Sequence, residues 1–184
     1  EMTSRALAKV FFVILLCGCA SLEKSSFSLL PKTPEMEQAF QRTERLFYAK
    51  RYDEAGPAYR DYLSNFPYNY YTPQANFRLA EIHLVREEWR EAIPLYEKSL
   101  ERGIYPDWGP RAVYQQAICY YRLEEYDRSF QVLDGFPRKG EGEIRVRAGS
   151  LRVKGARRSK NSQEEIKGYL ELVDGYSLLP PSQW

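Results

Sequence analysis

Apolar positions recur with a helical period along most of the chain, in blocks that repeat every 37 residues. Each block is marked by an aromatic residue, two polar residues and a small residue, at 52–55, 89–92 and 126–129. The aromatic and small members keep the 37-residue spacing throughout: Tyr52, Trp89 and Tyr126, with Ala55, Ala92 and Ser129. Apolar residues at helical spacing flank each marker on both sides, so each block predicts a helix, a tight turn and a second helix.

Two prolines support a true repeat. Pro57 and Pro94 each follow the aromatic marker by five residues. A proline within a helix removes a hydrogen bond, so we expect both in the first turn of the second helix, where N–H groups lack helical partners. A fourth, degenerate block is predicted over 143–176, with its second helix at 163–170 and Glu165 in place of the small residue.

These blocks resemble tetratricopeptide repeats. The pattern of that family is matched in the second block by Ala80, Trp89, Ala92 and Tyr96, and in the first by Tyr52, Ala55, Tyr59 and Pro67. Thr43 departs from the small residue of the first block, and the third block offers Ala117, Tyr120, Tyr126 and Ser129. The resemblance implies an all-α solenoid of three clear helix pairs and a degenerate fourth, over residues 35–176.

The N-terminal segment predicts export. Arg5 and Lys9 precede an apolar run at 10–16, which is too short to span a bilayer, for which about 20 residues are needed. The run ends in Leu16-Cys17-Gly18-Cys19 and resembles the lipobox of bacterial lipoproteins, in which the cysteine is acylated; a plain secretory signal is the alternative. We therefore expect a signal peptide at 1–18, lipidation at Cys19, a tether at 19–34 and a C-terminal tail at 177–184.

Composition gives little support to catalysis. Removing residues 1–18 leaves 25 basic and 24 acidic residues, so net charge favours no partner and nucleic acid is not expected. Cys119 is then the one cysteine besides Cys19, and we expect it to pack as a small apolar residue. His83 is the single histidine and is expected to be a packed, hydrogen-bonded residue. We expect no enzyme, metal site or cofactor.

The family resemblance also implies a partner-binding groove on the first helix of each unit. The positions implied are Phe40, Glu44, Phe47, Tyr48, Gln74, Phe77, Glu81, Leu84, Val85, Arg111, Tyr114, Ile118, Tyr121 and Arg122. Such an aromatic groove suits an extended or helical peptide of another envelope protein. The alternative is that neighbouring helices, the tether or a further domain cover these residues.

One segment is strongly basic. Residues 138–160 contain nine basic residues against Glu141 and Glu143. The predicted patch, formed by Arg145, Arg147, Arg152, Lys154, Arg157 and Arg158, indicates an anionic contact such as lipid headgroups, wall polymer or an acidic protein. The alternative is a solvated helix that pairs with acidic neighbours.

Signal, lipobox and repeats together resemble two kinds of envelope lipoprotein. One is the tetratricopeptide lipoprotein of the outer-membrane β-barrel assembly machine, through Tyr52, Ala55, Tyr62, Leu63, Phe66 and Pro67. The other is the N-terminal repeat region of penicillin-binding-protein activators, through residues 145–152, where a further domain would follow Trp184. Both imply a lipid-anchored scaffold that binds an envelope protein at the periplasmic face of the outer membrane, or regulates a cell-wall synthase.

Overall fold

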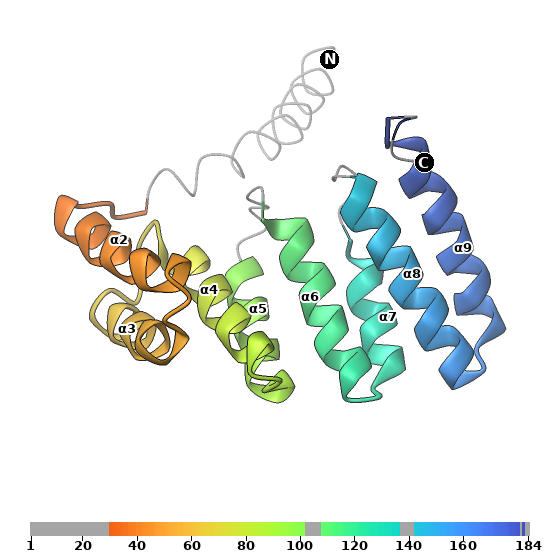
Figure 1. Ribbon diagram of the computed structural model, residues 1–184, viewed down its shortest axis with the longest axis horizontal. Helices are drawn as coiled ribbons and strands as arrows, with labels where there is room; N and C mark the ends of the chain where they lie inside the picture. Colours follow the sequence, from red (N-terminus) through yellow and green to blue (C-terminus); the bar gives the residue numbers. More distant parts are fainter. Residues whose placement is uncertain (1–29, 102–107, 137–141, 181, 183–184) are drawn as a thin grey trace, which may run out of the picture.

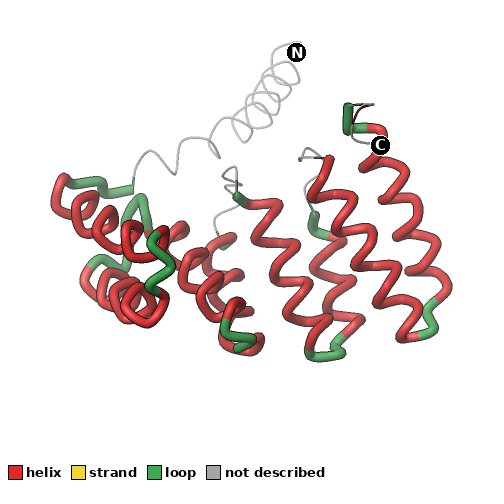
Figure 2. The backbone as a smooth tube through the Cα atoms, viewed as in Figure 1, coloured by secondary structure: helices red, strands yellow, loops and turns green. Residues whose placement is uncertain are grey.

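The described part of the chain is all-helical. The structure is a computed structural model that describes residues 30–101, 108–136, 142–180 and 182. Its helices are α2 (Pro34–Tyr48), α3 (Tyr52–Asn65), α4 (Thr72–Val85), α5 (Trp89–Leu100), α6 (Gly109–Arg122), α7 (Tyr126–Asp134), α8 (Gly142–Ser159) and α9 (Ser162–Ser177). Figure 2 shows these helices joined by loops, without a strand in the described residues.

The helices form four antiparallel pairs arranged in one row (Figure 1). We call α2, α4, α6 and α8 the first helices, and α3, α5, α7 and α9 the second helices. Each second helix packs on the first helix of its own pair and, up to α7, on the first helix of the next pair. α4 also contacts α6, and α6 contacts α8. This stacking is the solenoid architecture predicted from the 37-residue period.

The turn within each pair has the same backbone in all four pairs. One residue with positive φ lies in each turn: Lys50, Glu87, Glu124 and Lys160. The backbone N–H of the residue after each of these bonds a carbonyl five residues earlier, as Arg51 does to Leu46 and Asn161 to Ala156. This is a Schellman-type helix end, which satisfies carbonyls that the helix leaves unpaired. The fourth pair therefore follows the same turn geometry although its sequence is degenerate.

The small repeat residues lie in the core. Ala55, Ala92 and Ala117 are fully buried, and Ser129 donates a hydrogen bond from Oγ to the Ala117 carbonyl. Thr43, the exception in the first pair, is also buried because its hydroxyl donates to the Phe40 carbonyl at 2.7 Å. Small side chains at these positions let the helices of a pair approach closely, as the repeat pattern predicted.

Pro57 and Pro94 do not lie where the sequence placed them. α3 begins at Tyr52 and α5 at Trp89, so both prolines occupy the second helical turn instead of the first. The prediction was wrong because the aromatic marker opens the second helix and does not belong to the turn before it. Each helix therefore forgoes one backbone hydrogen bond.

Glycines bring α8 and α9 into close contact. Gly142 and Gly149 on α8, and Gly168 and Gly175 on α9, are each spaced by seven residues and are buried. A Cβ added at Gly168 would lie 2.7 Å from Cγ2 of Val153 and 3.0 Å from its backbone nitrogen. The fourth pair is thus held together by contact between backbones, without an alanine at the marker position.

Among the described residues, no helix has the length and apolar character that crossing a membrane requires.

Candidate functional site

A chain of ion pairs runs across the first helices. Glu44 of α2 accepts a hydrogen bond from Arg78 of α4 at 3.2 Å, and Arg78 also donates to Glu81 at 2.8 Å. Glu81 in turn pairs with Arg111 of α6. Both carboxylates are buried, whereas half of the Arg111 side chain is exposed. These contacts hold three successive first helices in register and neutralise the two buried acids.

The polar chain includes the buried Tyr59 hydroxyl, which donates to Glu44. Burial first, and then the contact with Glu44, raise the pKa of Tyr59 far above its ordinary value. The residue therefore stays a neutral hydrogen-bond donor to Glu44.

Two of the aromatic residues predicted for the groove are buried. Phe40 is 2% exposed and stacks on Tyr71 at 4.7 Å between ring centroids, and Phe77 is 1% exposed and stacks on Trp108 at 4.9 Å. Glu81 is likewise only 4% exposed. As placed by this structure, these three side chains build the interfaces between helix pairs and do not present a surface to a partner.

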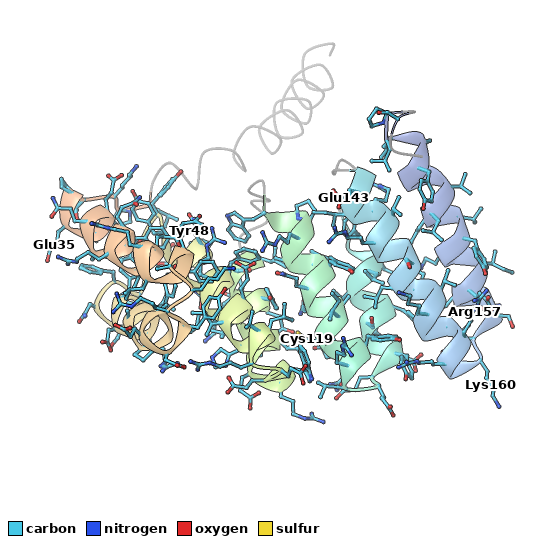
Figure 3. All side chains as sticks on the ribbon, viewed as in Figure 1. Glu35, Tyr48, Cys119, Glu143, Arg157 and Lys160 are labelled. Atoms are coloured by element: carbon cyan, nitrogen blue, oxygen red, sulfur yellow. The ribbon has the colours of Figure 1, made fainter. Side chains whose placement is uncertain are left out.

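The other predicted groove residues lie nearer the surface. Phe47, Leu84, Tyr114 and Tyr121 are half-buried, while Tyr48 and Arg122 are exposed. Tyr48, Val85, Arg122 and Arg158 follow one another at intervals of 37, 37 and 36 residues, one at the end of each first helix, and all four are exposed. We call these four residues the first-helix column; Figure 3 shows its first member, Tyr48, on the side of α2 that faces α4.

Arginine–aromatic contacts surround this column. Arg78 lies over the rings of Phe47 and Tyr48, at 4.8 and 5.3 Å from the ring centroids. Arg122 lies over Trp89 at 5.7 Å, and Arg158 over Tyr121 at 5.0 Å. The sequence analysis did not identify Arg78. Arg78 precedes Glu81 by three residues, which is a recognisable spacing for an ion pair on a helix. The column thus combines planar apolar surfaces with guanidinium groups.

The basic segment does not form one patch. Arg152 is fully buried and pairs with Asp134, Glu164 and Glu171, with its Nε 2.9 Å from Glu171. Burial alone would raise the pKa of Asp134, but the hydrogen bond from Lys167 and the Arg152 charge hold it below its usual range. For Glu171 burial dominates and raises the pKa. Including Arg152 in an accessible patch was wrong, because its guanidinium closes the α7–α8–α9 interface.

The remaining basic residues divide between paired and solvent-facing side chains. Arg145 is mostly buried and pairs with Asp174 at 2.9 Å, while Arg147 pairs with Glu143 and Arg157 with Glu165. Lys154 and Arg158 are exposed, and no ion pair is recorded for them within the described part. The labelled Glu143 and Lys160 mark the two ends of α8 in Figure 3, so these residues spread along the whole helix. Pairing with acidic neighbours therefore describes four of the six residues predicted for the patch.

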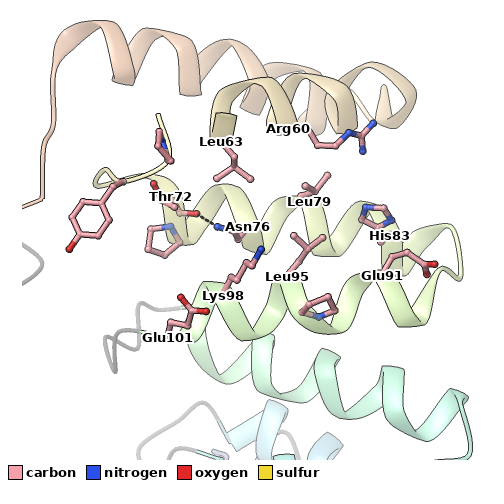
Figure 4. Close-up of a pocket in the computed structure, with 14 residues that line it drawn as sticks. Arg60, Leu63, Thr72, Asn76, Leu79, His83, Glu91, Leu95, Lys98 and Glu101 are labelled. Carbon is pink, nitrogen blue, oxygen red and sulfur yellow. Dashed lines mark hydrogen bonds between the residues drawn. The ribbon is translucent and has the colours of Figure 1, made fainter. Parts of the chain in front are cut away.

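A cavity opens between α3 and α5, where the sequence predicted no site. Its volume is about 850 Å³, and Leu63, Leu79 and Leu95 contribute apolar walls from α3, α4 and α5 (Figure 4). Charged side chains stand around it, namely Arg60, Lys98, Glu91 and Glu101. His83 also lines it, with Nδ1 2.6 Å from Glu88, which agrees with a hydrogen-bonded structural role.

The cysteines offer no reactive centre in the described part. Cys119 is fully buried and free, and burial raises the pKa of its thiol to about 12, so it packs as a small apolar residue as predicted. Cys19 lies outside the described residues. Within those residues there is also no cluster of three or more His, Cys, Asp or Glu side chains suited to a metal ion.

Two solved MamA structures agree with this architecture. A MamA double mutant has a TM-score of 0.59 at 16% identity and covers 96% of this chain and 97% of its own. MamA residues 41 to the end, from Desulfovibrio magneticus RS-1, has a TM-score of 0.58 at 15% identity, with 97% of each chain covered. The TPR2B domain of yeast Sti1 in complex with an Hsp70 peptide has a TM-score of 0.47 at 18% identity, covering 76% of this chain and 99% of the domain.

At the sequence level, no curated protein matches. The family model described as "Tetratricopeptide repeat" matches residues 44–107 and 77–144, which together span more than half of the chain. The aromatic and alanine markers, the four helix pairs and this match agree, and the chain belongs to the tetratricopeptide-repeat family.

Proposed function

We propose that this chain is a lipid-anchored, non-enzymatic scaffold of the bacterial cell envelope. It binds a protein or peptide partner at the first-helix column, in outer-membrane assembly or envelope maintenance. The proposal that the chain binds a partner there rests on the first-helix column, which places one exposed residue on each helix pair: Tyr48, Val85, Arg122 and Arg158. Extended surfaces of this kind are what repeat proteins use for binding.

The spacing of the column favours an extended segment as the ligand. The column offers one exposed residue per helix pair along the row, so the residues of an extended segment that meet successive members would lie several positions apart. The charge of the column favours acidic residues in the half of the segment that contacts Arg122 and Arg158, and an apolar or aromatic residue near Tyr48 and Val85.

Charge reversal tests this site. We expect Arg122→Glu with Arg158→Glu to weaken partner binding at least about tenfold, since like charges would then face an acidic segment. The matched control is Arg60→Glu with Lys98→Glu at the α3–α5 cavity, which changes net charge equally. Partners are recovered from envelope extracts with each variant and the dissociation constant is measured. If the control variant loses the partner and the Arg122→Glu, Arg158→Glu variant retains it, the binding site lies at the α3–α5 cavity and not at the first-helix column.

The envelope location rests on Leu16-Cys17-Gly18-Cys19 and is tested separately. Mass spectrometry of the mature N-terminus is expected to find an acylated Cys19, and the protein is expected in the membrane fraction. Cys19→Ser should abolish both the lipid and the anchoring. If the Cys19→Ser variant is processed and membrane-attached like the wild type, the proposed lipid anchor is wrong. That result would not bear on the proposed binding site.

A further inference from the structure

The surface of α9 that points away from α8 is apolar. Six of the ten exposed large hydrophobic side chains in the described chain belong to α9 or follow it directly, with exposed fractions from 44% to 70%. They are Ile166, Tyr169, Leu170, Val173, Tyr176 and Leu178. The first five recur at helical spacing and form one stripe, which we call the α9 stripe. α9 is the last helix that the structure describes, and an apolar outer face there calls for a neighbour, since a repeat that caps a solenoid normally presents a polar one.

The repeat explains why these positions are apolar. Ile166 and Tyr169 follow Phe130 and Leu133 of α7 by 36 residues, and Phe130 and Leu133 are 4% and 2% exposed. Leu133 packs with Ala148 of α8, the first helix of the next pair. The α9 stripe therefore occupies the positions at which each earlier second helix receives a neighbouring helix, so its shape and composition suit a docked helix.

The opposite end of the described row carries charged groups beside apolar ones. Glu35, Arg42 and Asp61 are exposed and line a cavity of about 420 Å³ between α2 and α3, together with apolar side chains such as Leu46 and Phe66. A head-to-tail contact would press the α9 stripe against these polar and charged groups, which would lose their water without apolar partners. Stacking of copies into an open filament would place these charged groups against the stripe, whereas a contact between two copies of the stripe would not.

The flank of the stripe is complementary to itself. Lys167 and Asp174 are seven residues apart on the same side of α9, and their side chains are 44% and 59% exposed although each has a partner in its own chain. In an antiparallel pair related by a two-fold axis, each flank meets the same flank running in the opposite direction. Lys167 of one copy then lies opposite Asp174 of the second copy, and the pairing occurs twice.

We propose that the α9 stripe is a dimer interface, in which α9 packs antiparallel against α9 of a second copy. The stripe is a contiguous exposed apolar surface along α9, the kind of patch that marks a contact between proteins. The dimer leaves the first-helix column open, so the two binding surfaces are separate and one assembly carries two partner sites.

The mass of the purified full chain tests the dimer, measured by multi-angle light scattering in mild detergent with the detergent contribution subtracted. We expect a dimer at micromolar concentration, and a dissociation constant raised about 100-fold by Leu170→Glu with Val173→Glu. Val85→Glu on α4 places a carboxylate at a similarly exposed position, at 59%, and should remain dimeric. Circular dichroism establishes that each variant is folded.

Exchange of charges tests the orientation. Lys167→Asp should weaken the dimer, and Lys167→Asp combined with Asp174→Lys should restore it. A monomeric wild type, a dimer that Leu170→Glu with Val173→Glu leaves intact, or a different protein bound stoichiometrically at α9 would each overturn the proposal. If the dimer of the double-exchange variant is no stronger than the dimer of Lys167→Asp alone, the antiparallel pairing is wrong.

Discussion

Replacing Arg152 with leucine should lower the free energy of unfolding by about 3 kcal/mol. The guanidinium is fully buried and is the shared partner of Asp134, Glu164 and Glu171, so leucine would leave three carboxylates close together with only Lys167 beside them. We place the loss at the lower end for a broken buried pair because the acids keep some contact with water, with side-chain exposures of 21% to 48%.

Urea denaturation followed by circular dichroism measures this effect, and Arg147→Leu is its control. Arg147 lies on the same helix, is 59% exposed and pairs with an exposed Glu143. Its loss should cost less than about 1 kcal/mol, as for other surface pairs. Equal stabilities for the two variants would mean that the Arg152 cluster does not close the α7–α8–α9 interface.

Two identical substitutions of glycine should change stability in opposite directions. A Cβ at Gly168 would lie 2.7 Å from Val153 and 3.1 Å from the Gly149 carbonyl oxygen, so Gly168→Ala must push α8 and α9 apart. We expect a loss of about 2 kcal/mol, within the range for overpacked cores.

Gly56 in α3 provides the matched control. Its added Cβ would find only ordinary contacts, at 3.8 Å from Arg60 Nη1 and from Ile82 Cγ2. Gly56→Ala should therefore raise stability by roughly 0.5–1 kcal/mol, because alanine favours the helix and restricts the unfolded chain. The midpoints of thermal unfolding compare the two variants, and a Gly168→Ala protein as stable as the wild type would refute close backbone packing in the fourth pair.

The period of the sequence was enough to predict the helix pairs, because the same constraint recurs in each of them. Alanine or serine occupies the space between paired helices at positions 55, 92 and 129, and each of these side chains is buried. The fourth pair lacks the small residue at this marker position, so the repeat pattern does not predict how its helices pack. Its helices meet through Gly149 and Gly168 instead. The seven-residue spacing of glycines in both helices is a sequence signal for this packing that the sequence analysis did not use.

The binding surface was harder to predict, since accessibility depends on what the loops cover. Phe40 and Phe77 occupy equivalent repeat positions, and each is buried under an aromatic residue that directly precedes the next pair. These covering residues, Tyr71 and Trp108, are themselves 37 residues apart. The sequence therefore contained this signal, but it lies in loops outside the helical pattern. Arg152 was misassigned for a related reason, because its acidic partners come from α7 and α9.

Site-specific photo-crosslinking in cells tests the partner-binding surface most directly. A photoreactive amino acid placed at Val85 or Arg122, on the first-helix column, is compared with the same residue at Arg60 or Lys98, beside the α3–α5 cavity. We predict that positions 85 and 122 yield an adduct with one and the same envelope protein, and that positions 60 and 98 do not. Adducts at 60 and 98 with none at 85 and 122 would contradict the assignment of partner binding to the first helices.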